Sequence, residues 1–469
     1  MCTDRANWVN LSTRFVDKAA LHKIKIGNLR SILDIDTQRQ VITVEPFATV
    51  GEVTRELEKQ GFMLAVTLEI EDATVGGLAM AVGMTTHSHK VGLYQESVLS
   101  YEMVLGDGRV VHATETEHTD LFRALPWSHG TLGFLVSLQI KIVPIKSHVR
   151  MKYQAVRSQK EYCAMVRELS MADEPPDFIE ATVFSKEEAV VMTGNFADPQ
   201  TADERAKINK VSRWHKPWFF KHVESYLAKG EGDEFIPLRH YLHRHDRAIF
   251  WVLQDMIPFG NHPVFRFLVG WACPPRVQFL KLTTTRGIRE LTFTKQVFQD
   301  IVLPMTELER SIELSEELFN IYPVLIYPCA IFDHGEQGGQ LRRPSKASLV
   351  PGKSYGMYND LGVYGVPAAV KNGEPYNATT AMRAMEAFIR KVGGYSFLYA
   401  DTFMDEAELR EMFDHTVYDA VRERYGADGA FPTLYDKIKP ELDVMTIGDT
   451  APTTLRSHGV VANSRPAAV

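Results

Sequence analysis

The sequence predicts a large α+β protein of 469 residues. Residues 136–142 alternate between apolar and polar side chains, which is typical of a half-buried strand. Gly106–Gly108 separates two short apolar runs, as expected for the turn of a β-hairpin. Thr49 and Glu52 stand at the spacing of a capping box and indicate where a helix begins. The chain is long enough for more than one hydrophobic core.

The first elements follow in chain order. Val41–Val44 is a short apolar run that predicts a strand. The helix that begins after Thr49 would place Val53 and Leu57 on one face, and Gly61 is expected to end it.

The hairpin arms come next, at residues 103–105 and 110–111 on either side of Gly106–Gly108. The alternating strand at 136–142 is expected to end at Pro144, because proline cannot donate a ladder hydrogen bond.

Composition changes over residues 146–395. We expect a charged helix at 160–169 and a buried strand within the apolar stretch 318–332. The stretch 334–355 is rich in Gly, Ser, Arg and Lys and predicts a loop, whereas 213–276 is aromatic and basic.

The C-terminal part begins with alternating aromatic residues at Tyr395, Phe397 and Tyr399, which predict one more strand. An acidic helix is expected at 405–413. The composition of the last 25 or so residues predicts a disordered tail.

Net charge, cysteine spacing and the length of apolar runs argue against a nucleic-acid binder, a disulfide-rich protein and a transmembrane protein. Lys plus Arg is 52 and Asp plus Glu is 59, giving a net charge of −7, which does not favour a nucleic-acid binder. The four cysteines form no CxxC pair and are expected to be reduced thiols in a cytosol-facing protein. There is no signal-peptide-like start and no uninterrupted apolar run of membrane-spanning length, so no transmembrane helix is expected.

The segment 72–86 is the most informative part of the chain. The pair Gly76 and Gly77 follows a β-branched residue and would let main-chain N–H groups converge on phosphate oxygens. The alternative is a glycine-rich packing turn. The candidate cofactor-binding residues here are Thr74, Val75, Gly76, Gly77, Leu78, Ala79, Met80, Ala81, Val82, Gly83, Met84, Thr85 and Thr86.

Three later segments, 89–94, 100–108 and 120–134, follow this glycine segment in an order that resembles a known domain. The order is similar to the FAD-binding (PCMH-type) domain of vanillyl-alcohol-oxidase-type flavoproteins. In that domain a TVGG-like loop, a strand with a DG hairpin and a GTLGF-type turn wrap an extended FAD.

A narrower resemblance covers most of the chain to about residue 440. It is to the Δ24-sterol reductase (seladin/diminuto) family, and it rests on residues 216–224, 237–245, 257–261, 398–401 and 430–437.

This resemblance implies a two-part FAD-binding domain, residues 1–145 and 396–440, with an inserted α+β cap domain at 146–395 and a tail at 441–469. FAD would be bound non-covalently by Thr74–Thr86, with Gly130 and Gly133 bordering its adenine half. The implied reaction is NADPH-dependent reduction of the Δ24 double bond in a sterol side chain. The implied location is the cytosolic face of the endoplasmic reticulum membrane.

Two departures from the family pattern keep alternatives open. Members usually carry an N-terminal membrane anchor, and this chain begins after it, so a cytoplasmic location is an alternative. The stretch 2–8, where the family has a glycine-containing phosphate loop, has no glycine, and Asp4 would repel a diphosphate unless Arg5 compensates. The alternative functions are a flavin-dependent alcohol or lactone oxidase and a non-catalytic sterol-binding or regulatory protein.

Reduction of an isolated double bond also needs a proton donor. The candidates are Tyr399, His243 and His245. For the histidines the alternatives are a structural hydrogen-bonded cluster and a site for the phosphates of the reductant. Flanking arginines oppose a metal site, and none is predicted. His87 and His89 could in principle carry a covalent flavin, although the resemblance implies a non-covalent one.

Two further segments contain patterns that resemble functional sites. Gly352–Gly356 matches GxSxG but lacks the strand-turn-helix context of a nucleophile elbow, so we dismiss it. Residues 249–274 mix aromatic and apolar side chains with arginines and predict either the core of the cap domain or a peripheral membrane contact.

Overall fold

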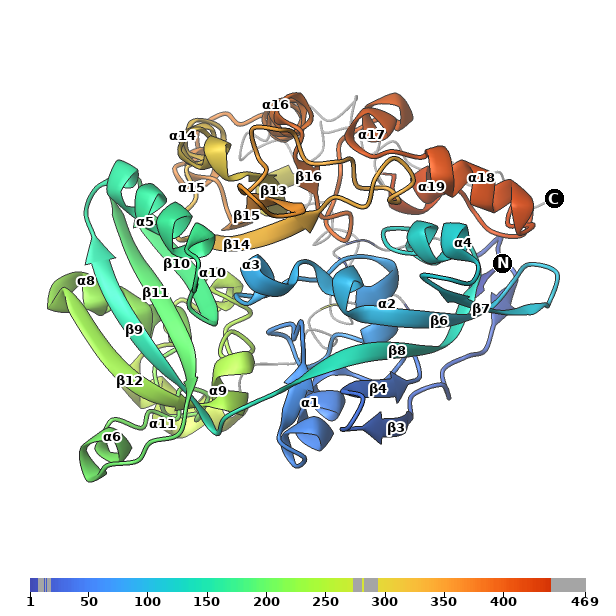
Figure 1. Ribbon diagram of the computed structural model, residues 1–469. Helices are drawn as coiled ribbons and strands as arrows, with labels where there is room; N and C mark the ends of the chain where they lie inside the picture. Colours follow the sequence, from blue (N-terminus) through green and yellow to red (C-terminus); the bar gives the residue numbers. More distant parts are fainter. Residues whose placement is uncertain (7–11, 13, 15–17, 273–280, 282–293, 440–469) are drawn as a thin grey trace.

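The computed structural model describes residues 1–6, 12, 14, 18–272, 281 and 294–439. Two large sheets dominate these residues, one built mainly from the first third of the chain and one from the middle (Figure 1). The predicted tail at 441–469 lies outside the described residues.

The first sheet has the order β3-β4-β8-β6-β7, with β5 paired to β8. Its strands are β3 (Ile32–Asp36), β4 (Val41–Val44), β5 (Phe62–Leu64), β6 (Val98–Val104), β7 (Val110–Thr114) and β8 (Phe134–Pro144). The helices beside it are α1 (Val50–Glu58), α2 (Val75–Met80), η2 (Tyr94–Ser97) and α4 (Thr119–Ala124), whereas α3 (Ser88–Val91) contacts β14 (Val324–Phe332) of the second sheet. A parallel pair, β1 (Cys2–Thr3) and β2 (Lys23–Ile24), forms a separate two-stranded sheet.

Local signals in the sequence account for these elements. Thr49 and Glu52 form both hydrogen bonds of the predicted capping box, which confirms where α1 begins. The helix ends at Glu58, and Gly61 with a φ of 80° stands just beyond it rather than at its end. β8 buries alternate residues and ends at Pro144, as predicted.

The second sheet has eight strands in the order β12-β9-β11-β10-β14-β15-β13-β16. They are β9 (His148–Val156), β10 (Phe178–Ser185), β11 (Glu188–Ala197), β12 (Glu231–Pro237), β13 (Val297–Pro304), β14 (Val324–Phe332), β15 (Tyr355–Gly365) and β16 (Tyr395–Ser396). All of its neighbouring strands are antiparallel. The predicted buried strand within 318–332 is β14, and the predicted loop at 334–355 precedes β15.

Helices surround this sheet. The longer ones are α5 (Gln159–Met171), which confirms the predicted charged helix, α14 (Leu308–Leu318) and α16 (Ala378–Val392). The shorter ones are α6 (Ala202–Ala206), α7 (Phe219–Glu224), α8 (Tyr226–Lys229), α9 (Leu238–Leu242), α10 (Val252–Met256), α11 (Pro263–Val269), η3 (Gly270–Ala272), η4 (Met305–Glu307) and α15 (Ala368–Lys371).

Three helices follow near the C-terminus: α17 contacts α16 beside the second sheet, and α18 contacts α4 beside the first (Figure 1). They are α17 (Glu406–Met412), α18 (Thr416–Arg424) and α19 (Leu434–Ile438). The predicted strand from Tyr395 to Tyr399 is wrong beyond Ser396. The chain turns there, because the ring of Phe397 packs at 5.8 Å against Trp127, which lies in the first half of the molecule, the part formed by the residues before β9, instead of continuing the sheet.

One contiguous cluster of buried apolar side chains joins the two sheets. The rings of Trp127 and Phe413 belong to it, with centroids 5.2 Å apart. Cys2, Cys163 and Cys329 are free thiols, and Cys273 lies outside the described residues.

Candidate functional site

Two of the predicted segments, 74–86 and 127–133, lie side by side. The N–H of Trp127 donates to the carbonyl of Ala81 at 3.1 Å, and the N–H of His129 donates to the carbonyl of Met80 at 2.7 Å. Trp127, His129 and Gly130 all adopt positive φ, at 65°, 51° and 73°. Non-glycine residues hold this strained conformation only where their surroundings enforce it, and such strain is frequent at ligand sites.

The two glycines of the pair have different surroundings. A Cβ on Gly76 would stand 2.4 Å from Cβ of Pro46, and the N–H of Gly76 donates to the carbonyl of Pro46 at 3.0 Å. The N–H of Val75 is likewise bound by the carbonyl of Ala48, at 3.0 Å. Close packing therefore explains Gly76. The prediction that its amide belongs to an anion-binding nest is wrong, because that N–H is already bound by Pro46.

Gly77 is the one exposed residue of Thr74–Thr86. A Cβ there would meet only the Thr74 hydroxyl, at 2.9 Å. A ligand could therefore approach the main chain of this segment beside Gly77, near the start of α2. The larger side chains of the segment, Leu78, Met80, Val82 and Met84, are buried in the core.

The predicted glycines of the second segment also differ. Gly130 is half-buried, and a Cβ on it would meet the Lys437 ammonium at 3.4 Å. Gly133 is buried against β6, where a Cβ would stand 3.0 Å from the carbonyl of Val104. Gly133 thus has a packing role in this structure, whereas Gly130 borders a cationic side chain.

Cations from both ends of the chain gather at these two segments. A guanidinium nitrogen of Arg5 lies 3.4 Å from the Thr74 hydroxyl. Lys437 on α19 donates to the carbonyl of His129. Arg14 donates to the carbonyl of Ile438 at 2.6 Å, so the N-terminal and C-terminal segments meet. Sequence reasoning noticed Arg5 but missed Arg14 and Lys437.

The electrostatics at this place favour an anionic ligand. Burial and the nearby charges of Lys18 and Arg14 lower the pKa of Lys437 to about 8. Burial also lowers the pKa of Arg5, to about 10. Nε2 of His129 is buried and has no hydrogen-bond partner among the described residues. A diphosphate would neutralise these clustered, buried positive charges, so the residues fit a dinucleotide such as FAD.

The end of the glycine segment reaches the second sheet, where the N–H of Ile179 on β10 donates to the carbonyl of Thr86 at 3.0 Å. The Thr86 hydroxyl lies 2.9 Å from the Tyr241 hydroxyl, and the Thr85 hydroxyl donates to the Glu69 carboxyl at 3.3 Å. His87 and His89 are buried with ring nitrogens on the carbonyls of Asp177 and Pro176. These two histidines therefore tie the segment to the residues before β10.

His243 and His245 lie at the junction of the two halves. Nδ1 of His243 is 3.3 Å from the carbonyl of Glu69, and Nε2 of His245 is 3.7 Å from the Glu180 carboxyl. Burial lowers the pKa of each ring to about 4. Both rings are therefore neutral at pH 7, which argues against the predicted role of proton donor.

Tyr399 lies in a different part of the junction. It is half-buried, its carbonyl accepts from the Ser12 hydroxyl at 2.6 Å, and its ring is 6.2 Å from that of Phe397. Among the described residues its contacts are separate from those of the two histidines, so the structure does not bring the three candidates into one cluster.

Sequence reasoning missed a set of buried carboxyls, which we call the carboxyl cluster: Glu69, Glu180, Asp300 and Asp360. Arg244 connects β10 and β14. It donates to Glu180 on β10 at 2.6 Å and to the hydroxyl of Tyr327 on β14 at 3.0 Å. Tyr327 faces Asp360 across β14 and β15. Arg244 also lies 3.8 Å from Glu69, which belongs to the first half.

Protonation differs within the carboxyl cluster. Burial raises the pKa of Glu69 and of Asp300 to about 7. Burial, reinforced by the charge of Asp300, raises the pKa of Asp360 well above its usual range. Burial alone would also raise the pKa of Glu180, but Arg244 and His245 lower it to about 2. A carboxyl that stays protonated at neutral pH is able to donate a proton.

A signal for this cluster was present in the sequence. Asp300 and Asp360 lie on strands that are otherwise mostly apolar, and carboxyls are seldom buried unless they are paired or functional. Arg244 stands inside the family segment 237–245. The spacing of these residues in the sequence could not show that they come together from separate strands.

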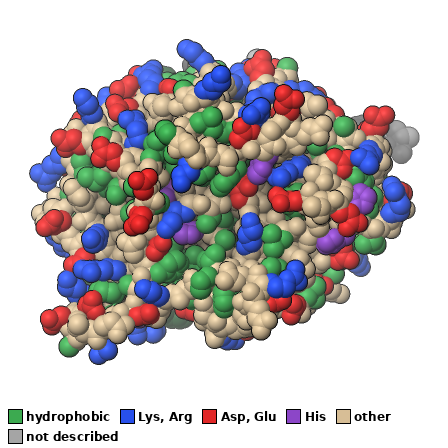
Figure 2. All heavy atoms as spheres, in the orientation of Figure 1, with side chains coloured by type: hydrophobic (Ala, Val, Ile, Leu, Met, Phe, Trp, Pro, Cys, Tyr) green, Lys and Arg blue, Asp and Glu red, His purple; other side chains and the backbone are tan. Residues whose placement is uncertain are grey.

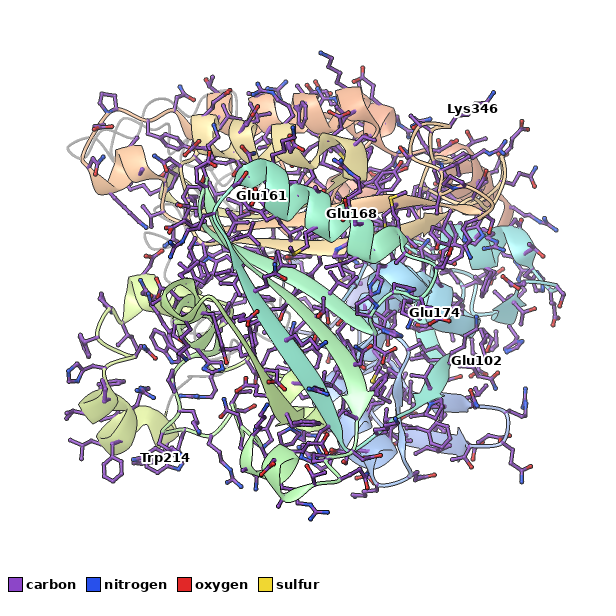
Figure 3. All side chains as sticks on the ribbon, turned by 60° about the vertical axis from the view of Figure 1, so that its left-hand side comes forward. Glu102, Glu161, Glu168, Glu174, Trp214 and Lys346 are labelled. Carbon is purple, nitrogen blue, oxygen red and sulfur yellow. The ribbon has the colours of Figure 1, made fainter. Side chains whose placement is uncertain are left out.

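A cavity of about 600 Å³ lies elsewhere, where α5 packs beside β9, β11 and β12. Its lining carries both signs of charge, with Arg150 and Lys152 near Glu168 and Asp233. Figure 3 labels Glu168 on α5 above the strands. Because Arg150 and Asp233 already form an ion pair at 3.2 Å, we do not assign this cavity to a phosphate-bearing ligand.

The surface gives two further observations. On the face drawn in Figure 2, acidic and basic side chains are interspersed, which does not favour a nucleic-acid interface. Within the described residues, no helix combines the length and apolarity needed to cross a bilayer.

Comparisons with known proteins agree with the geometry. A family model described as "FAD binding domain" matches residues 9–114. The chain is 43% identical to a human Delta(24)-sterol reductase over 441 residues, covering 93% of this chain and 82% of the relative. It is 36% identical to a Delta(24)-sterol reductase of Pisum sativum over 459 residues, covering 94% and 80%.

A shorter similarity involves a different enzyme. The L-gulonolactone oxidase of Mus musculus is 28% identical over 123 residues, covering 26% of this chain and 27% of that protein.

Proposed function

Because this chain belongs to the Delta(24)-sterol reductase family, we propose that it reduces the Δ24 double bond of a sterol side chain, using FAD and NADPH. The single observation that carries the proposal is the similarity over 93% of the chain to a reductase of that name. When bound, FAD supplies the hydride chemistry, and the protein positions and insulates the reacting groups.

The residues that would hold FAD are those at the meeting of 74–86 and 127–133. We assign its diphosphate to the exposed Gly77 main chain and to the cations of Arg5 and Lys437. Gly130 would border the same ligand. No histidine is assigned a covalent bond, because the rings of His87 and His89 are buried on main-chain carbonyls.

The eight-stranded sheet would act as the cap that covers the flavin and encloses the sterol. Contacts with the end of the glycine segment support this role, since the N–H of Ile179 on β10 donates to the carbonyl of Thr86 at 3.0 Å and the Thr86 hydroxyl lies 2.9 Å from that of Tyr241 on α9. A sterol side chain is uncharged, so apolar burial would supply most of its affinity.

The proton for the double bond would come from the carboxyl cluster. Asp360 is the favoured donor because its Oδ1 is buried without a hydrogen-bond partner among the described residues. Tyr399 stays an alternative donor, whereas His243 and His245 are better suited to hold the cluster in place, since their rings are neutral at pH 7.

The test starts with the absorbance spectrum of the purified full chain. A flavin spectrum that NADPH bleaches under anaerobic conditions, and that a Δ24 sterol restores with formation of the saturated product, would support the proposal. Restoration by oxygen alone, with no sterol product, would identify the oxidase that the similarity to L-gulonolactone oxidase brings into consideration. A colourless protein that added FAD cannot restore would indicate a non-catalytic sterol binder.

We further propose that the protein works at the cytosolic face of the endoplasmic reticulum membrane. Support comes from the family, whose sterol substrates are lipids. Immunogold or fractionation of cells expressing the full-length protein tests this location.

A further inference from the structure

The short helical segment formed by α11 and η3 exposes an apolar stripe. Val264, Phe267, Leu268 and Trp271 stand at positions i, i+3, i+4 and i+7, so they share one face of the helix. Their exposed fractions are 58%, 67%, 63% and 73%. Isolated exposed apolar residues are common, but a contiguous stripe of four large ones indicates a binding surface.

The polarity of α11 is inverted relative to a helix on a soluble surface. Its single charged residue, Arg266, is half-buried and turned toward the protein. The guanidinium donates to the carbonyl of Asn261 at 2.9 Å and to the carbonyl of His215 at 2.6 Å. The side chain of Arg266 thus holds α11 against the rest of the protein, and the apolar side chains face outward.

More large apolar groups extend the stripe. The ring of Trp214 lies 5.6 Å from that of Phe267, and Phe259 is 62% exposed. Figure 3 labels Trp214 at the edge of the molecule, away from Glu161 and Glu168 on α5. We call the surface formed by Trp214, Phe259, Val264, Phe267, Leu268 and Trp271 the α11 patch.

The charges beside the patch are basic. Between Glu204 and Glu224 the sequence holds six Lys or Arg residues and no Asp or Glu: Arg205, Lys207, Lys210, Arg213, Lys216 and Lys221. Lys207 pairs with Asp233, and Lys221 pairs with Glu224. Lys210 and Arg213 are exposed in the same segment as Trp214. Aromatic and aliphatic groups flanked by cations match the headgroup region of an anionic bilayer.

Aromatic residues that precede α11 in the chain contact the surroundings of the carboxyl cluster. Phe250 stacks on His245 with centroids 4.5 Å apart, and the indole N–H of Trp251 donates to the carbonyl of Tyr364 at 2.8 Å. Tyr364 in turn donates to Asp300.

We propose that the α11 patch inserts into the interfacial layer of a bilayer that contains anionic phospholipids. The proposal rests on the proposed function for the purpose of the contact, since a sterol substrate is dissolved in the bilayer. The binding itself follows from the exposed stripe, the inward Arg266 and the basic segment.

The test is co-sedimentation of the purified full chain with vesicles of phosphatidylcholine alone and of phosphatidylcholine containing about one quarter phosphatidylserine. We expect stronger binding to the second. The double variant Phe267→Glu/Leu268→Glu should reduce binding by about tenfold or more, because two inserted side chains become charged. The matched control is Leu33→Glu, which changes a residue that is 54% exposed on β3 and should leave binding unchanged.

A second variant tests the charge. Lys210→Gln/Arg213→Gln should remove most of the preference for phosphatidylserine while keeping the residual binding to neutral vesicles. Equal sedimentation of the Phe267→Glu/Leu268→Glu variant and wild type would overturn the proposal. A wild-type dimer on size exclusion that this variant converts to a monomer, without any vesicle binding, would show that the patch is a self-association surface and would also overturn it.

The two proposals fail in different ways. Sterol supplied in detergent micelles should still be reduced by the Phe267→Glu/Leu268→Glu variant, because the patch lies outside the cofactor site. If wild type binds vesicles but reduces no sterol, the proposed function is contradicted and the proposal of a membrane-binding patch is supported.

Discussion

Arg244 and Glu180 form a two-pronged ion pair, with nitrogen–oxygen distances of 2.6 and 3.1 Å, and both side chains are almost fully buried. Removing one partner of such a pair leaves an uncompensated charge in a medium of low polarity. The pair also connects α9's end to β10, so it holds the residues that precede α11 against the second sheet.

Arg244→Met should lower the free energy of unfolding by about 3–5 kcal/mol. The measurement is chemical denaturation of the purified protein followed by circular dichroism. The exposed pair of Arg343 and Asp333 provides the control, because Arg343→Gln should change stability by less than about 1 kcal/mol. Similar losses in the two variants would contradict the argument from burial.

Gly77→Asp should abolish retention of flavin, because it places a carboxylate where the diphosphate is assigned. The flavin content of the purified variant, read from its absorbance, checks this. Gly76→Ala is the matched control, and it should reduce stability through collision with Pro46 while folded protein keeps its flavin. Wild-type flavin content in Gly77→Asp would show that the diphosphate site is misplaced.

The affinity for FAD should fall as the pH rises above about 8, because Lys437 then loses its charge. Titration of the protein with FAD, followed by flavin fluorescence across pH 7–10, measures this. Lys437→Gln should weaken binding at pH 7 by about tenfold and flatten this part of the profile. A variant that keeps the wild-type fall in affinity would contradict the assignment.

The same lysine predicts an opposite trend for the protein without FAD. The pKa of Lys437 is lower in the folded than in the unfolded state, so the folded state binds fewer protons between about pH 8 and its ordinary value. Stability should therefore rise with pH through that window, and the rise should be smaller in Lys437→Gln. Thermal melts of FAD-free protein at pH 8 and pH 10 compare the two.

Glu69 should make the protein less stable as the pH rises from about 4.5 to 7. Its pKa is raised to about 7 in the folded state, so folding takes up a proton in that window, and that stabilisation is lost as the carboxyl ionises. Glu69→Gln should reduce the difference in melting temperature between pH 5 and pH 8. An unchanged difference would mean that Glu69 is not the responsible group.

Asp360→Asn should leave bleaching of the flavin by NADPH intact but slow formation of the saturated sterol by about a hundredfold. Rapid-mixing absorbance measures the first step, and mass spectrometry of the sterol measures the second. His245→Gln is the control and should keep the wild-type dependence of the second step on pH, because that ring is neutral over the range of interest. Equal rates for Asp360→Asn and wild type would exclude Asp360 as the donor.

The elements predicted well were those with local signals. The capping box of α1 and the alternation in β8 depend on residues a few positions apart, and both formed as expected. The strand predicted from Tyr395 to Tyr399 was cut short because Phe397 packs against Trp127, a contact between residues far apart in the chain. Local patterns contain no information about such a partner.

The candidate site shows the same division. The glycine pair marked the right loop, but spacing could not show that Pro46 occupies the space beside Gly76 while Gly77 stays open. The roles of Lys437 and Arg244 depend on which distant segments they meet. The carboxyls on apolar strands were the one signal for the buried cluster that a sequence reader could have used.

Arg5 and Lys437 approach the same loops from opposite ends of the polypeptide. The full set of positive charges therefore assembles only after α19 has left the ribosome. If the diphosphate binds beside these cations as proposed, flavin binding is a late event in biosynthesis, and a yellow colour of the protein would indicate that α19 has docked. A fragment ending before residue 434 should accumulate as a pale protein even where its first sheet folds correctly.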